Sequence, residues 1–171
     1  MLLAMRLLAL TMAALALTVS TAHGDGNSAL KRLAHRHLHP APLVPTTAPP
    51  SLRPIDSTLQ LSGHSRTPGA YALRLVHNAP NGPEAIIALS RGDFHTLHAA
   101  IVDARRASFK VRRAGIRGKH GYLMTSTTGD LEYLLAWKED GQIYEIGTGT
   151  TGTVSLAQLK ATATGLKHLK S

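Results

Sequence analysis

Proline is distributed very unevenly along this chain of 171 residues. Seven of the nine prolines lie between Asp25 and Pro68, among serine, threonine and alanine. Because proline fixes φ and lacks a backbone N–H, this density opposes helices and sheets and favours an extended spacer. We therefore expect a disordered linker over residues 25–68, in which only "TLQLSGH" (58–64) offers an edge strand, and a single compact domain over residues 69–171.

The N-terminus has the layout of a secretory signal. One positive charge, Arg6, precedes an apolar run from Leu7 to Val19, and small residues follow. The run is shorter than the ~20 residues that span a bilayer, so the pattern predicts a cleaved signal peptide over residues 1–24. Cleavage is expected after Ala22 or Gly24. The mature protein should then be secreted or periplasmic, without a transmembrane span.

The chain is basic and contains no cysteine. The lack of cysteine excludes a disulfide framework and a thiolate metal site. The formal net charge of +9 includes Arg6, so the mature chain keeps about +8, a surplus that favours anionic partners.

The positive charge is concentrated in one stretch. Between positions 105 and 119 seven bases occur without an acid: Arg105, Arg106, Lys110, Arg112, Arg113, Arg117 and Lys119. In "FKVRR" strand alternation sends Phe109 and Val111 inward and Lys110 and Arg112 outward, which would gather charge on one sheet face. We predict that these seven residues contact an anionic envelope component or an acidic protein surface. Nucleic acid is a poor partner, because export separates the protein from it and aromatic stacking platforms are missing.

Histidines form two groups, and neither predicts a metal site. His35, His37 and His39 alternate within the linker, where fixed ligand geometry and supporting contacts are missing. His95 and His98 are spaced to share a helical face near Asp93, but no HExxH or comparable pattern accompanies them. Whether the three linker histidines bind metal stays open. No metal or cofactor is predicted for the domain.

The domain sequence alternates between strand-like and helical patterns. Strand patterns occur in "AYALRLVH", "AIIALSRG", "SFKVRRAGIRG", "HGYLMTST", "LEYLLAWKED" and "GQIYEIG". Asp93 is placed to cap a helix in "FHTLHAAIVDARRA". The dipeptides Thr128-Gly129 and Asp140-Gly141 mark tight turns, so successive strands should pair antiparallel. Adjacent strands with few helices predict an α+β fold rather than a parallel doubly wound sheet.

A final helix is expected after Ser155. Ser155 and Gln158 form the S-x-x-Q pattern of a capping box, and leucines at positions 156, 159, 166 and 169 with Ala163 form one apolar stripe that includes Gly165 in the helix. The stripe should pack on a sheet face. The preceding Gly147-x-Gly149-x-x-Gly152 resembles a dinucleotide fingerprint, but the helix starts beyond it and no acid follows Glu145. We therefore predict no nucleotide binding.

The segment "GYLMTSTTGDLEYLLAWKEDGQIYEIGTGTTGTVSLAQLKATATGL" resembles the end of a bacterial extracytoplasmic domain family of unknown function, found in anti-sigma-factor-like and lipoprotein-like proteins. Leu135-x-Trp137, the Asp140-Gly141 turn, Tyr144 and the helix starting at Ser155 carry the resemblance, over residues of roughly 120–169. It implies a curved antiparallel sheet with a helix packed on one face, used for binding or sensing. The membrane span and cytoplasmic zinc segment usual in such proteins are missing, which argues against direct sigma-factor control.

No Gly-x-Ser-x-Gly elbow or Ser-x-x-Lys motif surrounds any serine, so the sequence predicts no enzyme. The function that fits best is an exported, non-enzymatic binding or sensory module at the cell envelope. The alternative is a carrier that holds an apolar or lipid ligand between the sheet and the C-terminal helix. For that alternative, Trp137 and Tyr144 are the candidate groove residues, although aromatic residues more often pack in a core.

Overall fold

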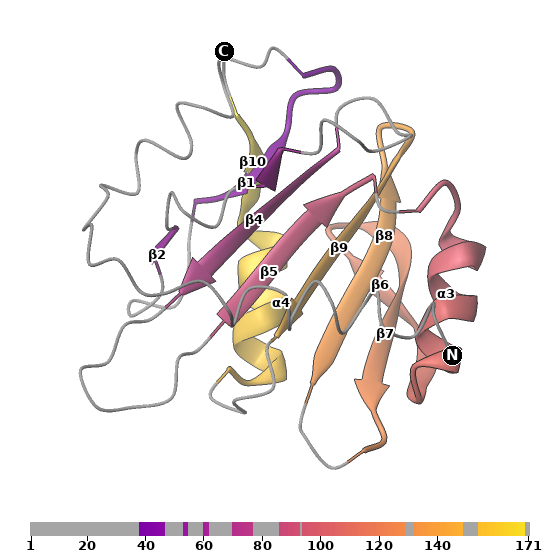
Figure 1. Ribbon diagram of the computed structural model, residues 1–171. Coiled ribbons are helices and arrows are strands. Elements are labelled where there is room, and N and C mark those ends of the chain that lie inside the picture. Colours follow the sequence, from indigo (N-terminus) through magenta and orange to yellow (C-terminus); the bar gives the residue numbers. More distant parts are fainter. Residues whose placement is uncertain are drawn as a thin grey trace.

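The fold was analysed in a computed structural model, which describes residues 38–46, 53–54, 60–61, 70–76, 86–92, 94–128, 132–148 and 154–169 (Figure 1). The predicted signal peptide lies outside these residues. The elements are β1 (Leu43–Pro45), β2 (Arg53–Pro54), β3 (Gln60–Leu61), β4 (Tyr71–Val76), β5 (Ile86–Arg91), α3 (Leu97–Arg106), β6 (Phe109–Ile116), β7 (Lys119–Ser126), β8 (Tyr133–Glu139), β9 (Gln142–Thr148), α4 (Leu156–Thr164) and β10 (Leu166–His168).

The predicted α+β fold with an antiparallel sheet is confirmed. An eight-stranded sheet has the order β2-β4-β5-β9-β8-β7-β6, with β3 also pairing β4, and a two-stranded sheet joins β1 to β10. Strands β6 to β9 form a meander in which each strand pairs antiparallel with the next. The Asp140-Gly141 turn has positive φ at both residues (50° and 77°), which suits a two-residue hairpin turn.

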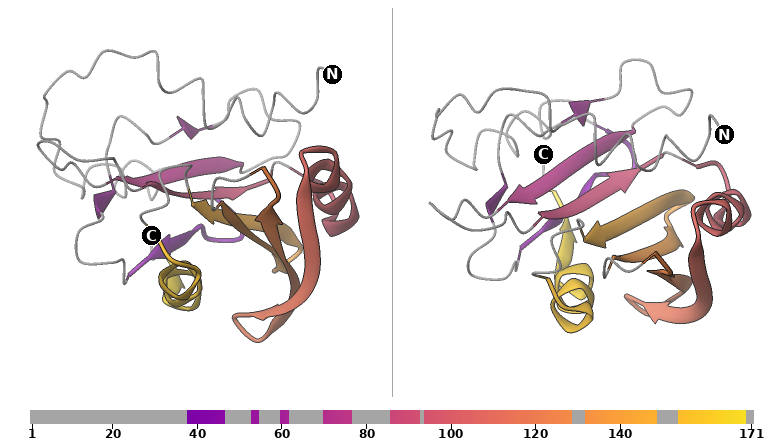
Figure 2. Two further views of the ribbon diagram at one scale, coloured as in Figure 1. Left: turned by 90° about the horizontal axis from the view of Figure 1, so that it is seen from below. Right: turned by 60° about the horizontal axis from the view of Figure 1, so that its bottom comes forward.

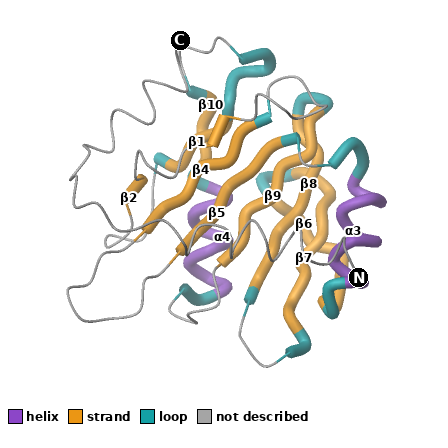
Figure 3. Tube along the Cα trace, viewed as in Figure 1, coloured by secondary structure: helices purple, strands orange, loops and turns teal. Residues whose placement is uncertain are grey.

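The sheet is open and curved, and a separate hydrophobic cluster lies on each face. The larger cluster joins the sheet to α4, β1 and β10, and it includes Trp137, Tyr144, Ile146 and Leu159. The smaller cluster packs α3 against β6 to β8 around Met124. Figure 2 shows the β6–β7 hairpin bending toward the side of the sheet on which α4 lies. In Figure 3, α3 lies at the β6–β8 end of the sheet, whereas α4 contacts β9 and β6.

The predicted C-terminal helix forms, but it is shorter than expected. Ser155 accepts a hydrogen bond from the Gln158 N–H, and the Gln158 side chain accepts one from the Ser155 N–H, so the capping box is confirmed. Leu159 and Ala163 are buried against the sheet. The expectation that Gly165 lies within the helix is wrong, because Gly165 caps the C-terminus and Leu166 then pairs with Pro45.

Helix α3 has a different cap from the one predicted. It begins at Leu97, and its N-cap is Thr96, whose hydroxyl accepts a hydrogen bond of 3.1 Å from the Ala99 N–H. The prediction of Asp93 as the cap is therefore wrong, since Thr96 lies directly before the first turn and has the required oxygen.

Part of the expected linker belongs to the core. Leu43 is completely buried, and its carbonyl oxygen accepts a hydrogen bond of 2.5 Å from the Tyr71 hydroxyl. The buried Arg91 guanidinium lies over the Tyr71 ring and donates a hydrogen bond of 2.5 Å to the Pro40 carbonyl. The prediction of a disordered linker is therefore wrong for residues 38–46, and so is the domain boundary at residue 69. The short edge strand expected within residues 58–64 is present as β3.

Candidate functional site

The predicted basic residues lie around the edge of the sheet that β6 forms. Six of the seven are exposed: Arg105, Arg106, Lys110, Arg112, Arg113 and Lys119. We call these six residues the basic edge. Within the described part of the chain, β6 pairs only with β7, so no strand covers its other edge. The basic edge therefore combines unpaired strand backbone with concentrated positive charge.

The basic edge presents charge on both faces of the sheet, not on one as predicted. Phe109 and Val111 are partly buried against the smaller cluster, under α3, as expected. Lys110 and Arg112 point to the opposite face. Arg113 follows Arg112 directly and so returns to the α3 face. Arg105 and Arg106 extend the basic surface from the last turn of α3.

An open depression of about 500 Å³ lies on the surface beside Arg113. Its lining combines a guanidinium, an imidazole and a phenol with small residues: Leu97, Arg113, Ala114, Gly115, His120, Gly121 and Tyr122. Arg113 and Tyr122 are direct cross-strand partners, as are Gly115 and His120. A space with this lining suits a small anionic or aromatic group of a partner, because the guanidinium supplies charge and a planar set of donors.

Arg117, the seventh predicted residue, is used inside the fold. It lies in the β6–β7 turn with φ of 53°, and its side chain is only 14% exposed. Its Nη1 donates to three carbonyl oxygens where α4 ends and β10 begins, those of Ala163 (3.2 Å), Thr164 (3.2 Å) and Leu166 (2.5 Å). Two of these carbonyls belong to the last turn of α4 and the third begins β10, so Arg117 adds side-chain donors to the end of the helix from a distant turn. Its charge is therefore committed to the fold rather than presented to a partner.

The same guanidinium forms an ion pair with Glu139. Arg117 Nε lies 2.9 Å from Glu139 Oε2, Nη2 lies 3.2 Å from Oε1, and the Trp137 indole N–H donates to Oε2 at 2.8 Å. Burial alone would raise the pKa of Glu139. The hydrogen bonds from Arg117 and Trp137 and the Arg117 charge outweigh burial and hold the pKa below its usual value. Glu139 is therefore a charged, largely buried acceptor.

The candidate groove residues lie in the core. Trp137 and Tyr144 are fully buried and stacked, with ring centroids 5.6 Å apart. Burial raises the pKa of Tyr144, and the nearby Arg91 opposes this increase. Leu159 and Ala163 of α4 belong to the same cluster, so side chains occupy the space between sheet and helix at this point. The two aromatic rings line no exposed groove here.

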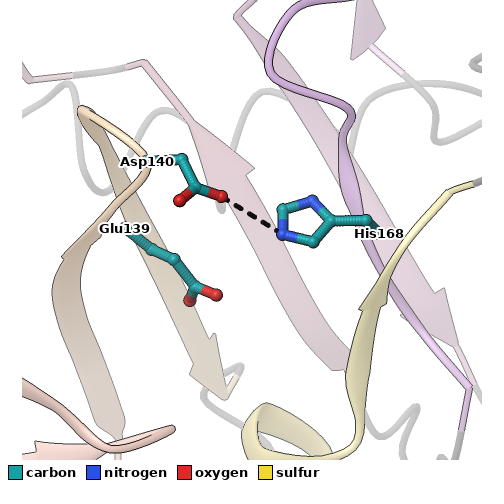
Figure 4. Close-up of side chains that lie close together, drawn as sticks. All are labelled: Glu139, Asp140 and His168. Atoms are coloured by element: carbon teal, nitrogen blue, oxygen red, sulfur yellow. Dashed lines mark ion pairs between the residues drawn. The ribbon is translucent and has the colours of Figure 1, made fainter.

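A second polar cluster, missed by the sequence analysis, lies where β8, β9 and β10 meet (Figure 4). Ligand atoms of Glu139, Asp140 and His168 all lie within 4.8 Å of one another. His168 Nε2 is 3.2 Å from Asp140 Oδ2, and its Nδ1 is 2.8 Å from the Ala41 carbonyl oxygen. No local motif could reveal this cluster, because His168 is distant in sequence from the two acids.

The predicted histidines form no comparable group in the described residues. His95 precedes α3 and His98 lies in its first turn, and both are exposed. His35 and His37 lie outside the described residues, as do Gly149 and Gly152 of the glycine-rich stretch. Within the part of the chain that the structure describes, no helix is long and apolar enough to cross a bilayer.

Comparison of the chain with protein-family models, with curated proteins and with solved structures gave no significant match. The resemblance to the extracytoplasmic domain family therefore stays a prediction.

Proposed function

We propose that this protein is an exported, non-enzymatic binding module that contacts an anionic partner at the cell envelope through the basic edge. The coincidence of six exposed bases with an open strand edge carries the proposal. No acid lies between Asp103 and Asp130 in the sequence. Among the described residues, no ion pair neutralises any of the six. The surface therefore attracts anions and retains that charge in the folded state.

An acidic protein segment in extended conformation fits this surface best. The outer edge of β6 offers backbone N–H and C=O groups, which an added strand satisfies by main-chain pairing. Bases on both sheet faces match a strand whose alternate side chains point to both faces. An anionic lipid headgroup uses the charge alone, and it gains nothing from the strand edge.

Lysine and arginine also protect edge strands against aggregation, so the charge needs a specific test. The probe is a fluorescein-labelled peptide of alternating glutamate and threonine, and fluorescence anisotropy measures its binding to the mature protein. We expect salt-sensitive binding, and at least tenfold weaker binding by the double variant Arg112→Glu/Arg113→Glu. The matched control is Lys160→Glu/Lys167→Glu, which changes net charge equally at exposed positions of α4 and β10 and should bind within twofold of wild type.

Two further probes separate the components of the proposal. A peptide with alternate N-methylated residues keeps its charge but cannot pair its backbone, and we expect it to bind at least tenfold more weakly. Equal binding by both peptides would mean that charge alone attracts the peptide and that no strand is added to β6. Binding to phosphatidylglycerol vesicles but not to the peptide would replace the protein partner with a lipid surface. Equal binding by the two charge-reversal variants would refute the basic edge.

Export is tested on the chain recovered from the secreted or periplasmic fraction. Intact mass and N-terminal sequencing should give a chain that starts at His23 or Asp25, in agreement with cleavage after Ala22 or Gly24. Recovery of a chain that retains Arg6 in a membrane fraction would refute the proposed location.

A further inference from the structure

The cluster of Glu139, Asp140 and His168 brings two distant parts of the chain together, the β8–β9 turn region and the end of β10. Glu139 ends β8, Asp140 lies in the β8–β9 turn, and His168 ends β10. Side chains of Asp140 and His168 are 49% and 41% exposed, so an ion reaches both from solvent. The carboxylates and the imidazole point toward one another in Figure 4.

The hydrogen bond to Ala41 determines which nitrogen of His168 is available. A carbonyl oxygen only accepts, so Nδ1 at 2.8 Å from the Ala41 oxygen carries the proton. In a neutral imidazole Nε2 then carries a lone pair, and it faces Asp140 Oδ2 at 3.2 Å. A proton on Nε2 makes this contact an ion pair, and a metal ion bound to both atoms can take the place of that proton. Metal-binding histidines are commonly oriented in this way, by donating the other ring N–H to a backbone carbonyl.

The local charge also favours a cation. The bidentate ion pair with Arg117 neutralises Glu139, whereas among the described residues the Asp140 carboxylate has a single ion-pair partner, His168. Glu139 Oε2 accepts two hydrogen bonds, whereas Oε1 accepts one, from Arg117. One oxygen of Glu139 therefore retains acceptor capacity toward the cluster.

We propose that Asp140 and His168, supported by Glu139, form a binding site for a divalent transition-metal ion of the zinc class. An imidazole nitrogen with carboxylate oxygens is a ligand set typical of Zn²⁺, Co²⁺ and Ni²⁺, whereas Ca²⁺ and Mg²⁺ prefer oxygen alone. Water completes the coordination, so the site is open and binds more weakly than a closed four-ligand site. A bound ion links the β8–β9 turn to β10 and, through Ala41, to the segment that precedes β1.

The site is tested by binding and by thermal unfolding. Because His35, His37 and His39 offer a competing site, the background protein carries glutamine at all three positions. We expect one Zn²⁺ per chain by competition with a chromogenic chelator, a Co²⁺ visible spectrum, and a Tm that rises with Zn²⁺. Asp140→Asn and His168→Gln should each weaken Zn²⁺ binding at least tenfold and abolish the Tm increase.

The control variants keep the test decisive. Asparagine tolerates the left-handed backbone at position 140 (φ 50°), so Asp140→Asn should preserve the turn. It therefore still tests the site if His168→Gln does not fold. His98→Gln removes an exposed histidine on α3 and should leave binding unchanged. Absence of stoichiometric Zn²⁺ binding in the background protein, or binding by both site variants as tight as that of the background protein, would overturn the proposal. This outcome is independent of the peptide assay at the basic edge.

Discussion

Replacement of Arg117 by methionine should destabilise the domain more than loss of any other basic side chain in residues 105–119. The substitution removes both hydrogen bonds to Glu139 and the three to carbonyl oxygens where α4 ends and β10 begins. Glu139 would then be a largely buried charge that keeps only its bond from Trp137. The α4 carbonyls would lose their cap at the same time.

The magnitude follows from the burial of the pair. Breaking a buried ion pair by removal of one partner costs about 3–5 kcal/mol. The side chains of Arg117 and Glu139 are 14% and 10% exposed, so water compensates a little and the lower end, about 3 kcal/mol, is expected. For a domain of this size that corresponds to a decrease in Tm of about 12 °C.

Urea unfolding followed by the fluorescence of Trp137 measures this effect. Trp137 is the only tryptophan of the chain, and it is buried and hydrogen-bonded to Glu139. The double variant Arg117→Met/Glu139→Gln should be less destabilised than the sum of its single variants, by about 1–3 kcal/mol, because it leaves no buried charge unpaired. Arg112→Met is the matched control and should stay within about 0.5 kcal/mol of wild type. A free energy of unfolding for Arg117→Met within about 1 kcal/mol of wild type would refute the assigned role.

Three other predictions concern stability and are read from urea unfolding curves. A Cβ at Gly121 would lie 2.5 Å from a backbone oxygen of β8, so Gly121→Ala should cost about 1–3 kcal/mol, whereas Gly115→Ala has no atom within 4 Å and should be neutral or slightly stabilising. Leu43→Ala should cost about 3 kcal/mol, and no loss would mean that residues 38–46 do not belong to the core. Burial raises the pKa of Asp103, with the Arg106 charge opposing it, so this group favours the folded state less as pH rises from 3.8 through the raised value. Asp103→Asn should therefore be more stable than wild type at pH 7, and the difference should disappear below pH 3.8; a constant difference would contradict this reasoning.

Local chemistry predicted most of the elements, because the signals that define them lie within a few residues. The capping box at Ser155 and Gln158 fixed the start of α4, and Asp140-Gly141 gave the β8–β9 hairpin. The predicted end of α4 was wrong because the leucine spacing continues past Gly165. Pairing of Leu166 with Pro45 overrides that spacing, and no helical pattern contains information about a strand partner so distant in sequence.

The same distance explains the error over residues 38–46. A proline-rich stretch resembles a linker, yet β1 needs few donors because it pairs with a single strand, β10. Hydrogen bonds from the Tyr71 hydroxyl and the Arg91 guanidinium attach this segment to the sheet. Both side chains belong to strands of the main sheet, and the proline pattern contains no information about them. Arg117 shows a related limit, since composition counts its charge but cannot show that helix carbonyls far along the chain accept hydrogen bonds from it.

The exposed position of β6 could be predicted only in part from the sequence. Tight turns predicted an antiparallel meander, and a meander of four strands places its first and last members at its edges. Which of these two edges stays open depends on β5, which pairs with β9 and not with β6. Helix α3 connects β5 to β6 across the smaller cluster and so carries the chain to the far end of the sheet. The basic stretch that follows α3 therefore becomes an open edge, and charge and unpaired backbone meet there because of one non-local strand pair.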